Sequence, residues 1–368
     1  MNDDYKIIDT RTNEDFKKST FSGYKKRDVY NVLYKSMDTK KAENACNWIT
    51  ECICSSYIEE SWSNLLIYAF KTVNINNPTL PCFLYNKNSL FYNIYDSMDP
   101  KNPFAVYELK NNQIIRNLFF SIVTILTLSS KTKRYDKHPR FKPTDFDFDI
   151  IQKRLTADLN LLPGDFIRFE EPEELKIIMN EIYFHLKNKI GGYEKSLYWI
   201  LWILEWEKRN IKVKNPWKID CREVDVKAKF TADLVWIIWN VIILEANNRN
   251  NFIKRQIKSL YELYKFQFNL RKRNKRLPYI IQCVCYLTHN INETVPLISD
   301  KVIYVQTGIN NNSMFKIKKI HEKNDIIKEK LSRSETKPKP QKVVEKKMET
   351  EKMKSKIDIF NELDGINL

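Results

Sequence analysis

Apolar residues recur every three or four positions along most of this chain, which is the spacing of one buried face of an α-helix. The pattern predicts helices over 39–55, 57–74, 79–98, 111–130, 146–157, 172–190, 194–210, 224–248, 250–274, 277–290 and 313–331. Asn77-Pro78 and Gly191-Gly192 mark turns between neighbouring helices. We therefore predict an all-α fold, a two-lobed array of antiparallel helix pairs that is collar-like or α-solenoid-like.

Other stretches lack this helical pattern. Residues 1–37 are polar and irregular, and Val302 to Val305 predict a short extended segment within 296–312, because β-branched and aromatic residues follow one another there. The acidic stretch 165–174 contains proline and is a natural hinge. Residues after 331 are rich in Lys, Glu and Pro and bury too little apolar surface to order themselves. The predicted organisation is an irregular N-terminal segment, an N-terminal helical lobe, a C-terminal helical lobe, a disordered linker and a terminal docking motif, which occupy 1–37, 38–160, 171–331, 332–356 and 357–368.

The composition favours helices with a large core. Only six Gly occur among 368 residues, and helices avoid Gly whereas tight β-turns need it. Apolar residues make up 43% of the chain, enough for a sizeable core. Five tryptophans have the spacing of buried helix faces and are expected to pack in that core: Trp199, Trp202, Trp206, Trp236 and Trp239. Three acidic residues near them are expected at exposed helix ends: Glu205, Glu207 and Glu245.

The seven Cys fit a reducing, intracellular setting. Their number is odd and most lie within apolar runs, unlike the dense cysteines of a secreted disulfide scaffold. Cys52/Cys54 and Cys283/Cys285 are spaced C-x-C, whereas zinc sites more often use C-x2-C. Buried free thiols are therefore expected at these positions.

Familiar catalytic signatures are missing from the sequence. The chain has no P-loop, no dinucleotide-binding glycine motif, no G-x-S-x-G and no H-E-x-x-H, and its four His are scattered. Asp145, Asp147 and Asp149 occupy every second position. They precede a helical pattern, where acidic side chains interact favourably with the helix dipole or face water. We predict a protein that is not an enzyme and has no metal or other cofactor, with an unfamiliar active site left open.

The chain is basic, with a formal net charge of +16. Residues 332–368 carry nine Lys/Arg against seven Asp/Glu, so most of the positive charge belongs to the helical body. A basic body indicates a nucleic acid or an acidic protein as partner. A coding bias toward Lys, Asn and Ile is a second explanation for the excess.

Residues 249–276 hold ten Lys/Arg against a single acid, Glu262. A basic helix face of this kind suits contacts to nucleic-acid phosphates without reading of the bases. The alternative is a solvated face whose cations stabilise a helix C-terminus. The candidate nucleic-acid-binding residues are Lys254, Arg255, Lys258, Lys265, Arg271, Lys272, Arg273, Lys275 and Arg276, extended by the loop residues Lys131, Lys133 and Arg134.

Apolar residues return at the end of the chain, after the polar linker. This layout is typical of a tethered recognition motif that binds a protein partner. The candidate partner-binding residues are Ile357, Ile359, Phe360, Leu363, Ile366 and Leu368. No apolar stretch reaches the ~18–20 residues that span a bilayer, so no membrane partner is predicted.

A recognisable pattern runs through residues 42–84: Ala45-Cys46-Asn47-Trp48, Ser55-Ser56-Tyr57, Trp62, and Asn76-Asn77-Pro78-Thr79-Leu80-Pro81. It continues with Asn112, Ile115-Arg116 and Leu118-Phe119. The pattern resembles a family of helical proteins encoded by nucleocytoplasmic large DNA viruses, some of which are labelled clamp-loader-like subunits of the viral DNA polymerase system. The resemblance covers roughly residues 38–290, and Ser56 stands where the family usually has Gly.

The resemblance implies a non-catalytic accessory subunit of viral DNA replication, located in the host cytoplasm or nucleus. In phage-type clamp loaders a helical subunit lacks ATPase motifs while its partners carry them, so a missing P-loop is expected. The implied partners are DNA, the polymerase, the sliding clamp or ATPase loader subunits. The tail departs from the clamp-binding pattern Q-x-x-[ILM]-x-x-[FY]-[FY], which does not support a direct clamp contact through it. The alternative is a virion structural or assembly protein that binds DNA or capsid components.

Overall fold

The computed structural model describes residues 3–99, 102, 104–132, 138–158 and 160–334, and within these ranges it is all-α, without a β-strand. Two compact units divide the chain, residues 1–318 and 319–368. The first unit contains both of the predicted helical lobes up to Lys318. The prediction of an all-α array of helix pairs is confirmed.

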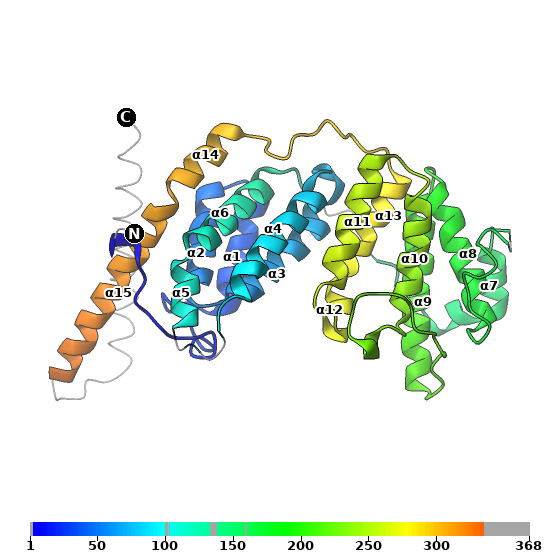
Figure 1. Ribbon diagram of the computed structural model, residues 1–368, viewed down its shortest axis with the longest axis horizontal. Helices are drawn as coiled ribbons and strands as arrows, with labels where there is room; N and C mark the ends of the chain where they lie inside the picture. Colours follow the sequence, from blue (N-terminus) through cyan, green and yellow to red (C-terminus); the bar gives the residue numbers. More distant parts are fainter. Residues whose placement is uncertain (1–2, 100–101, 103, 133–137, 159, 335–368) are drawn as a thin grey trace. The chain divides into compact units, whose positions relative to one another are not determined.

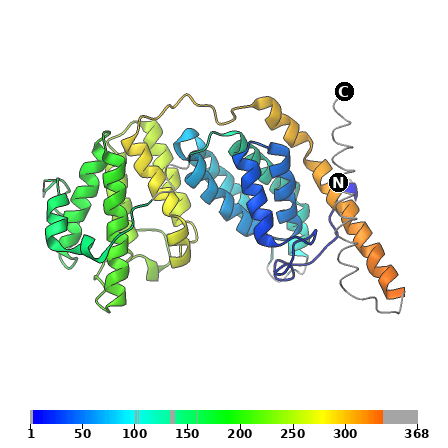
Figure 2. The same cartoon turned by 180° about the vertical axis from the view of Figure 1, so that it is seen from behind.

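The first group of helices, blue to cyan in Figure 1 and Figure 2, packs around aromatic side chains. It comprises α1 (Lys26–Asp38), α2 (Ala42–Cys54), α3 (Ile58–Tyr68), α4 (Leu80–Tyr95), α5 (Ala105–Asn111) and α6 (Gln113–Leu128). Consecutive helices α1 and α2 pack on one another, and α2 packs on α6. The buried indole of Trp62 stacks on Phe91 and meets the ring of Phe119 edge-on, with centroids 4.3 and 5.5 Å away. Aromatic contacts of this kind fix the helices relative to one another.

The second group, green to yellow in Figure 1, contains the Trp-rich helices. It comprises α7 (Phe148–Arg154), α8 (Glu173–Lys187), α9 (Gly192–Lys212), α10 (Leu234–Ala246), α11 (Asn251–Lys265), α12 (Leu270–Lys275) and α13 (Leu277–Thr288). Trp236 and Trp239 on α10 pack against Tyr264 on α11, with ring centroids 5.9 and 5.1 Å apart. Four of the five predicted core tryptophans are buried, and Trp206 is half-buried.

Contacts between α4 and α11 join these two groups within the first unit. The Cys82 amide donates to the Gln256 side chain at 3.0 Å. The Tyr286 hydroxyl donates to the Pro78 carbonyl at 2.6 Å, and Phe70 packs on Tyr279 with centroids 4.4 Å apart. Because α11 packs on α4, only its opposite face is open to a partner.

The N-terminal segment and the start of one helix differ from the sequence prediction. Residues 1–37 are not irregular throughout, because α1 occupies Lys26–Asp38 and buries Val29, Tyr30 and Leu33 at helical spacing. Residues 224–233 are not part of α10, which begins only after the Asp233 side chain caps it.

The predicted extended segment is also wrong, since Val302 to Val305 lie in the helix α14 (Lys301–Ile309). The Asp300 side chain accepts from the Ile303 amide and caps this helix. Tyr304 bonds Ser121 and Thr307 bonds Thr124 on α6, at 2.8 and 3.1 Å. Packing on α6 therefore overrides the local preference for a strand. The next helix, α15, spans Asn311–Ser334.

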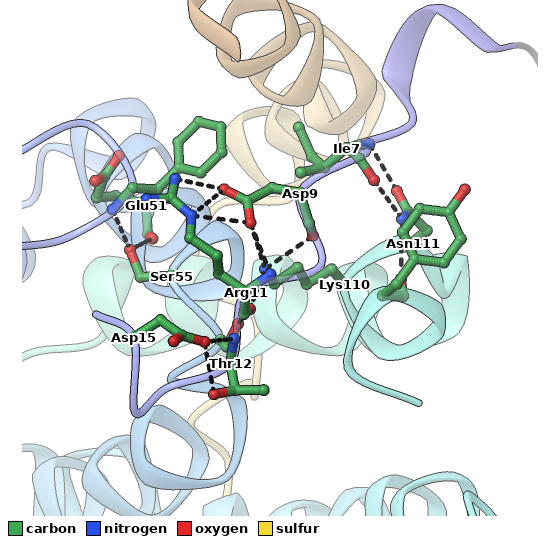
Figure 3. A network of polar contacts seen from close by, with 12 residues as sticks. Ile7, Asp9, Arg11, Thr12, Asp15, Glu51, Ser55, Lys110 and Asn111 are labelled. Carbon is green, nitrogen blue, oxygen red and sulfur yellow. Dashed lines mark hydrogen bonds and ion pairs between the residues drawn. The ribbon is translucent and has the colours of Figure 1, made fainter. Parts of the chain in front are cut away.

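The irregular segment before α1 is held by buried polar side chains (Figure 3). Lys110 is fully buried and donates to the carbonyls of Asp9 and Arg11, at 3.2 and 2.9 Å. The Asn111 amide group bonds both the backbone NH and the carbonyl of Ile7, at 2.9 Å each. These bonds satisfy the backbone of a segment that has no helix of its own there.

The cysteines are free thiols, and most of them are buried. Five of the seven Cys are buried, including both C-x-C pairs, and all seven are free, as predicted. Burial raises the pKa of the Cys46, Cys52 and Cys54 thiols to about 12.

Across the ranges that the structure covers, we find no helix whose length and apolar content would let it cross a membrane.

Candidate nucleic-acid interface

Three cations lie on the exposed face of α11. The helix begins after Asn250, whose side chain accepts from the Ile253 amide at 3.0 Å. Its apolar face buries Ile257, Leu260, Leu263 and Tyr264. The opposite face exposes Lys254, Arg255 and Lys258, which lie one helical turn or less apart. We call these three residues the α11 basic face.

No described residue forms an ion pair with the α11 basic face. The three cations also lie in the N-terminal half of a helix that ends at Lys265. None of them lies in the last turn, where the helix dipole stabilises cations, and Arg255 and Lys258 also lie beyond the first turn, where it disfavours them. Stabilisation of a helix C-terminus therefore does not account for these three cations, while a solvated helix face stays the alternative to an interface.

The basic run does not continue as one stripe beyond Lys258. Lys265 is mostly buried and pairs with Glu262 at 3.0 Å. The helix then stops, because Gln267 adopts a φ of +48°. A separate short helix, α12, starts after Asn269, whose side chain accepts from the Lys272 amide at 2.9 Å. The predicted single helix over 250–274 is therefore two helices that present different faces.

Two arginines of the α12 region form ion pairs or hydrogen bonds with other parts of the protein. Arg273 lies between two carboxylates, 2.6 Å from Glu207 and 3.0 Å from Asp233. Arg276 is buried and donates from one nitrogen to the carbonyls of Tyr264 and Phe266, both at 2.7 Å. These bonds close the connection between α11 and α12. Neither guanidinium is free to hold a phosphate.

The acids near the Trp-rich helices were predicted at exposed ends, and for two of them this is wrong. Glu207 pairs with Arg273 and is largely buried. Glu245 is buried and pairs with Arg249 at 2.7 Å. Sequence inspection missed both pairs because their cationic partners occur on other turns or other helices.

The remaining α12 cations line a cleft of about 400 Å³. Arg271 and Lys275 are exposed and have no partner among the described residues, while Lys272 is half-buried and donates to Gln267 at 2.9 Å. Burial lowers the pKa of Lys272, and the neighbouring Arg276 lowers it further. With Arg276 they form the basic wall of this cleft.

Helices α3 and α4 supply the facing wall. Glu59 accepts long hydrogen bonds from the hydroxyls of Tyr92 and Tyr95, at 3.4 and 3.5 Å. Its neighbour Glu60 pairs with Lys26 at 2.5 Å. Phe266 closes the cleft against Tyr92, with ring centroids 4.4 Å apart. Sequence patterns gave no sign of this wall, because its residues lie about 200 positions before α12 and meet it only in the folded chain.

Of the predicted loop residues, the structure describes only Lys131. Lys131 follows α6, and its ammonium donates to the Thr127 carbonyl of that helix. Burial lowers the pKa of Lys131 to about 8, and nearby Lys40 on the α1–α2 turn adds to the shift. Lys133 and Arg134 lie outside the described residues. So do the predicted partner-binding residues Ile357, Ile359, Phe360, Leu363, Ile366 and Leu368.

Metal ligands do not gather in the described part of the chain, where no group of three or more His, Cys, Asp or Glu side chains could hold an ion. Asp147 and Asp149 face solvent, and Asp145 accepts from the Lys142 amide at 2.7 Å. The three aspartates thus cap a turn or face water, as predicted.

Comparison of the chain with protein-family models, with curated proteins and with solved structures found no match. The family resemblance described above therefore stays a prediction. The positions of the cations are the main structural clue to function. Those on the α11 basic face, together with Arg271 and Lys275 at the cleft, have no ion-pair partner among the described residues, whereas Lys265 and Arg273 do.

Proposed function

We propose that this protein is a non-catalytic accessory subunit of DNA replication that holds the DNA backbone on the α11 basic face. The observation that supports this proposal most is that Lys254, Arg255 and Lys258 are exposed on one helix face and form no ion pair with any described residue. Lys and Arg on a rigid helix bind phosphates without reading the bases. The site is therefore expected to bind DNA of any sequence.

The replication setting rests on the family resemblance. Under this proposal, the polymerase, the sliding clamp or ATPase loader subunits would be the protein partners, and the virus-infected cell would be the place of action. A subunit of this kind needs DNA contact and partner contact but no catalytic group of its own.

The salt dependence of binding tests the phosphate contacts. Each phosphate neutralised on duplex DNA contributes about 0.9 to the slope of log K against log salt. A Lys254→Gln/Arg255→Gln/Lys258→Gln variant is expected to bind a 20-base-pair duplex more weakly, with a slope about 2.7 lower in magnitude. Fluorescence anisotropy between 50 and 200 mM NaCl measures both quantities.

A charge-matched control separates local contacts from net charge. Arg27, Lys35 and Lys41 are exposed on α1 and at the start of α2, and none of them forms an ion pair with a described residue. Changing these three to Gln removes the same charge and is expected to leave the slope almost unchanged. Equal losses in the two variants would contradict the α11 basic face as the site.

A further inference from the structure

We propose that the cleft between α3, α4 and α12 binds a nucleoside monophosphate unit, either free or at the end of a nucleic-acid strand. The phosphate would lie against Arg271 and Lys275, and the sugar and base would extend toward Glu59. This site is separate from the α11 basic face and does not depend on it.

An anionic group fits the basic wall. Arg271 and Lys275 have no partner among the described residues, and Lys272 and Arg276 add positive charge beside them. Burial and then repulsion from Arg276 lower the pKa of Lys272, while the charge of Glu59 acts to raise it. A phosphate with several acceptor oxygens relieves the repulsion through charge-assisted hydrogen bonds.

The facing wall offers a hydrogen-bond acceptor, Glu59, to a donor group of the ligand. Glu59 is half-buried and forms no ion pair with any described cation, and its two hydrogen bonds from Tyr92 and Tyr95 are long. An ionised carboxylate only accepts hydrogen bonds, so Glu59 has capacity for hydroxyl or amino donors. Inorganic phosphate held at the basic wall has no sugar or base that could extend to this wall. Ribose hydroxyls and exocyclic amines are donors of this kind.

Aromatic side chains in the lining suit a flat ring of the ligand. Tyr95 and Phe266 are partly exposed, and bases stack on such rings, whereas the Tyr92 ring is buried and packs against Phe266. The cleft volume of about 400 Å³ lies within the range of roughly 300–1,000 Å³ for small-molecule sites. A peptide end carries a carboxylate and donors but no flat ring system in the middle. These features favour a nucleotide over a peptide.

The walls are fixed before a ligand arrives. The Trp62 indole on α3 donates to the Asn88 side chain on α4 at 3.0 Å. On the other side, the Arg276 guanidinium holds the carbonyls of Tyr264 and Phe266. Glu59 forms no ion pair with a described cation of α12, although its charge acts to raise the pKa of Lys272. A ligand with both kinds of group bridges the two walls at little conformational cost.

Calorimetric titration of the full chain with adenosine 5′-monophosphate tests the proposal. We expect adenosine monophosphate to bind. Adenosine and inorganic phosphate should each bind at least roughly tenfold more weakly, because each of them contacts a single wall. Arg271→Gln/Lys275→Gln and Glu59→Gln should each weaken nucleotide binding roughly tenfold. Arg271 and Lys275 are exposed, so the double variant is expected to fold normally.

Two further arms decide the source of the ligand and the independence of the site. A single-stranded pentanucleotide that binds more tightly with a 5′-phosphate than without it assigns the cleft to a strand end, while binding of the free nucleotide alone assigns it to a metabolite. The Lys254→Gln/Arg255→Gln/Lys258→Gln variant should lose duplex affinity and keep nucleotide affinity. No nucleotide binding by the wild type, equal binding by the cleft variants, or preference for an acidic dipeptide would overturn the proposal.

Discussion

A Lys318→Met variant is expected to lose about 3–5 kcal/mol of unfolding free energy at pH 7. The Lys318 ammonium lies 2.5 Å from the Glu51 carboxylate and 3.1 Å from the Ser22 hydroxyl, and both charged side chains are buried. Methionine fills the same space but leaves Glu51 without its counter-ion. Such a loss should be measured by urea unfolding followed by circular dichroism.

The pH dependence of this loss follows from Glu51. Burial raises the pKa of Glu51, but Lys318 and the hydrogen bonds from Ser22 lower it more, so the folded pKa lies below its ordinary value. The pair therefore stabilises the fold above the unfolded pKa of about 4.3 and loses this effect as the pH falls through the folded pKa. In the variant Glu51 protonates earlier, so the difference between the two proteins should shrink in acid.

Lys316 provides the matched control for Lys318. It is exposed, has no described partner and lies two residues away on α15. Lys316→Met is expected to change the unfolding free energy by less than about 0.5 kcal/mol. A similar loss in both variants, or a Lys318 effect that grows in acid, would show that the buried pair is not what stabilises this region.

An Arg273→Gln variant is expected to be unstable by about 3–5 kcal/mol, whereas Arg271→Gln, two residues away, should stay within about 0.5 kcal/mol of the wild type. Arg273 is the shared counter-ion of Glu207 and Asp233. Burial raises the pKa of both carboxyl groups even with Arg273 present. Without it, two buried carboxylates would face each other.

The pH dependence distinguishes this mechanism from a simple packing defect. Acids with a raised folded pKa destabilise the fold as the pH rises through and above their unfolded pKa values. The Arg273→Gln loss should therefore be larger at pH 8 than at pH 5, as followed by thermal unfolding. A loss that is independent of pH would point to packing, and a comparable loss in Arg271→Gln would contradict the division of α12 into interior and cleft residues.

Helix positions could be predicted from the sequence wherever the apolar spacing was long and regular. Residues 113–128 and 277–288 fall inside predicted helices because almost every side chain there can be buried. The prediction was wrong at Val302 to Val305, where β-branched residues favour a strand locally but Thr307 and Tyr304 bond α6. Contacts with a helix some 180 residues away decide that segment, and local propensity cannot report them.

For the candidate interface, the sequence could predict only how many basic residues the segment contains. The sequence showed ten Lys/Arg over 249–276 but not which of them have partners. Arg273 finds Glu207 across 66 residues, and Arg276 bonds carbonyls that become free only because Gln267 ends α11. The free cations are those left over after folding. This is why Lys254, Arg255 and Lys258 carry the proposed function and Arg273 does not.

Lysine acylation followed by peptide mass spectrometry, with and without duplex DNA, tests the DNA-binding surface most directly. Bound phosphates should protect Lys254 and Lys258 from the reagent, while the exposed Lys35 on α1 and Lys195 on α9 should react equally in both samples. The protection should disappear at high salt, because released counterions drive the binding. Unchanged labelling of Lys254 and Lys258 in a sample that demonstrably binds DNA would contradict the proposal that α11 holds the DNA backbone.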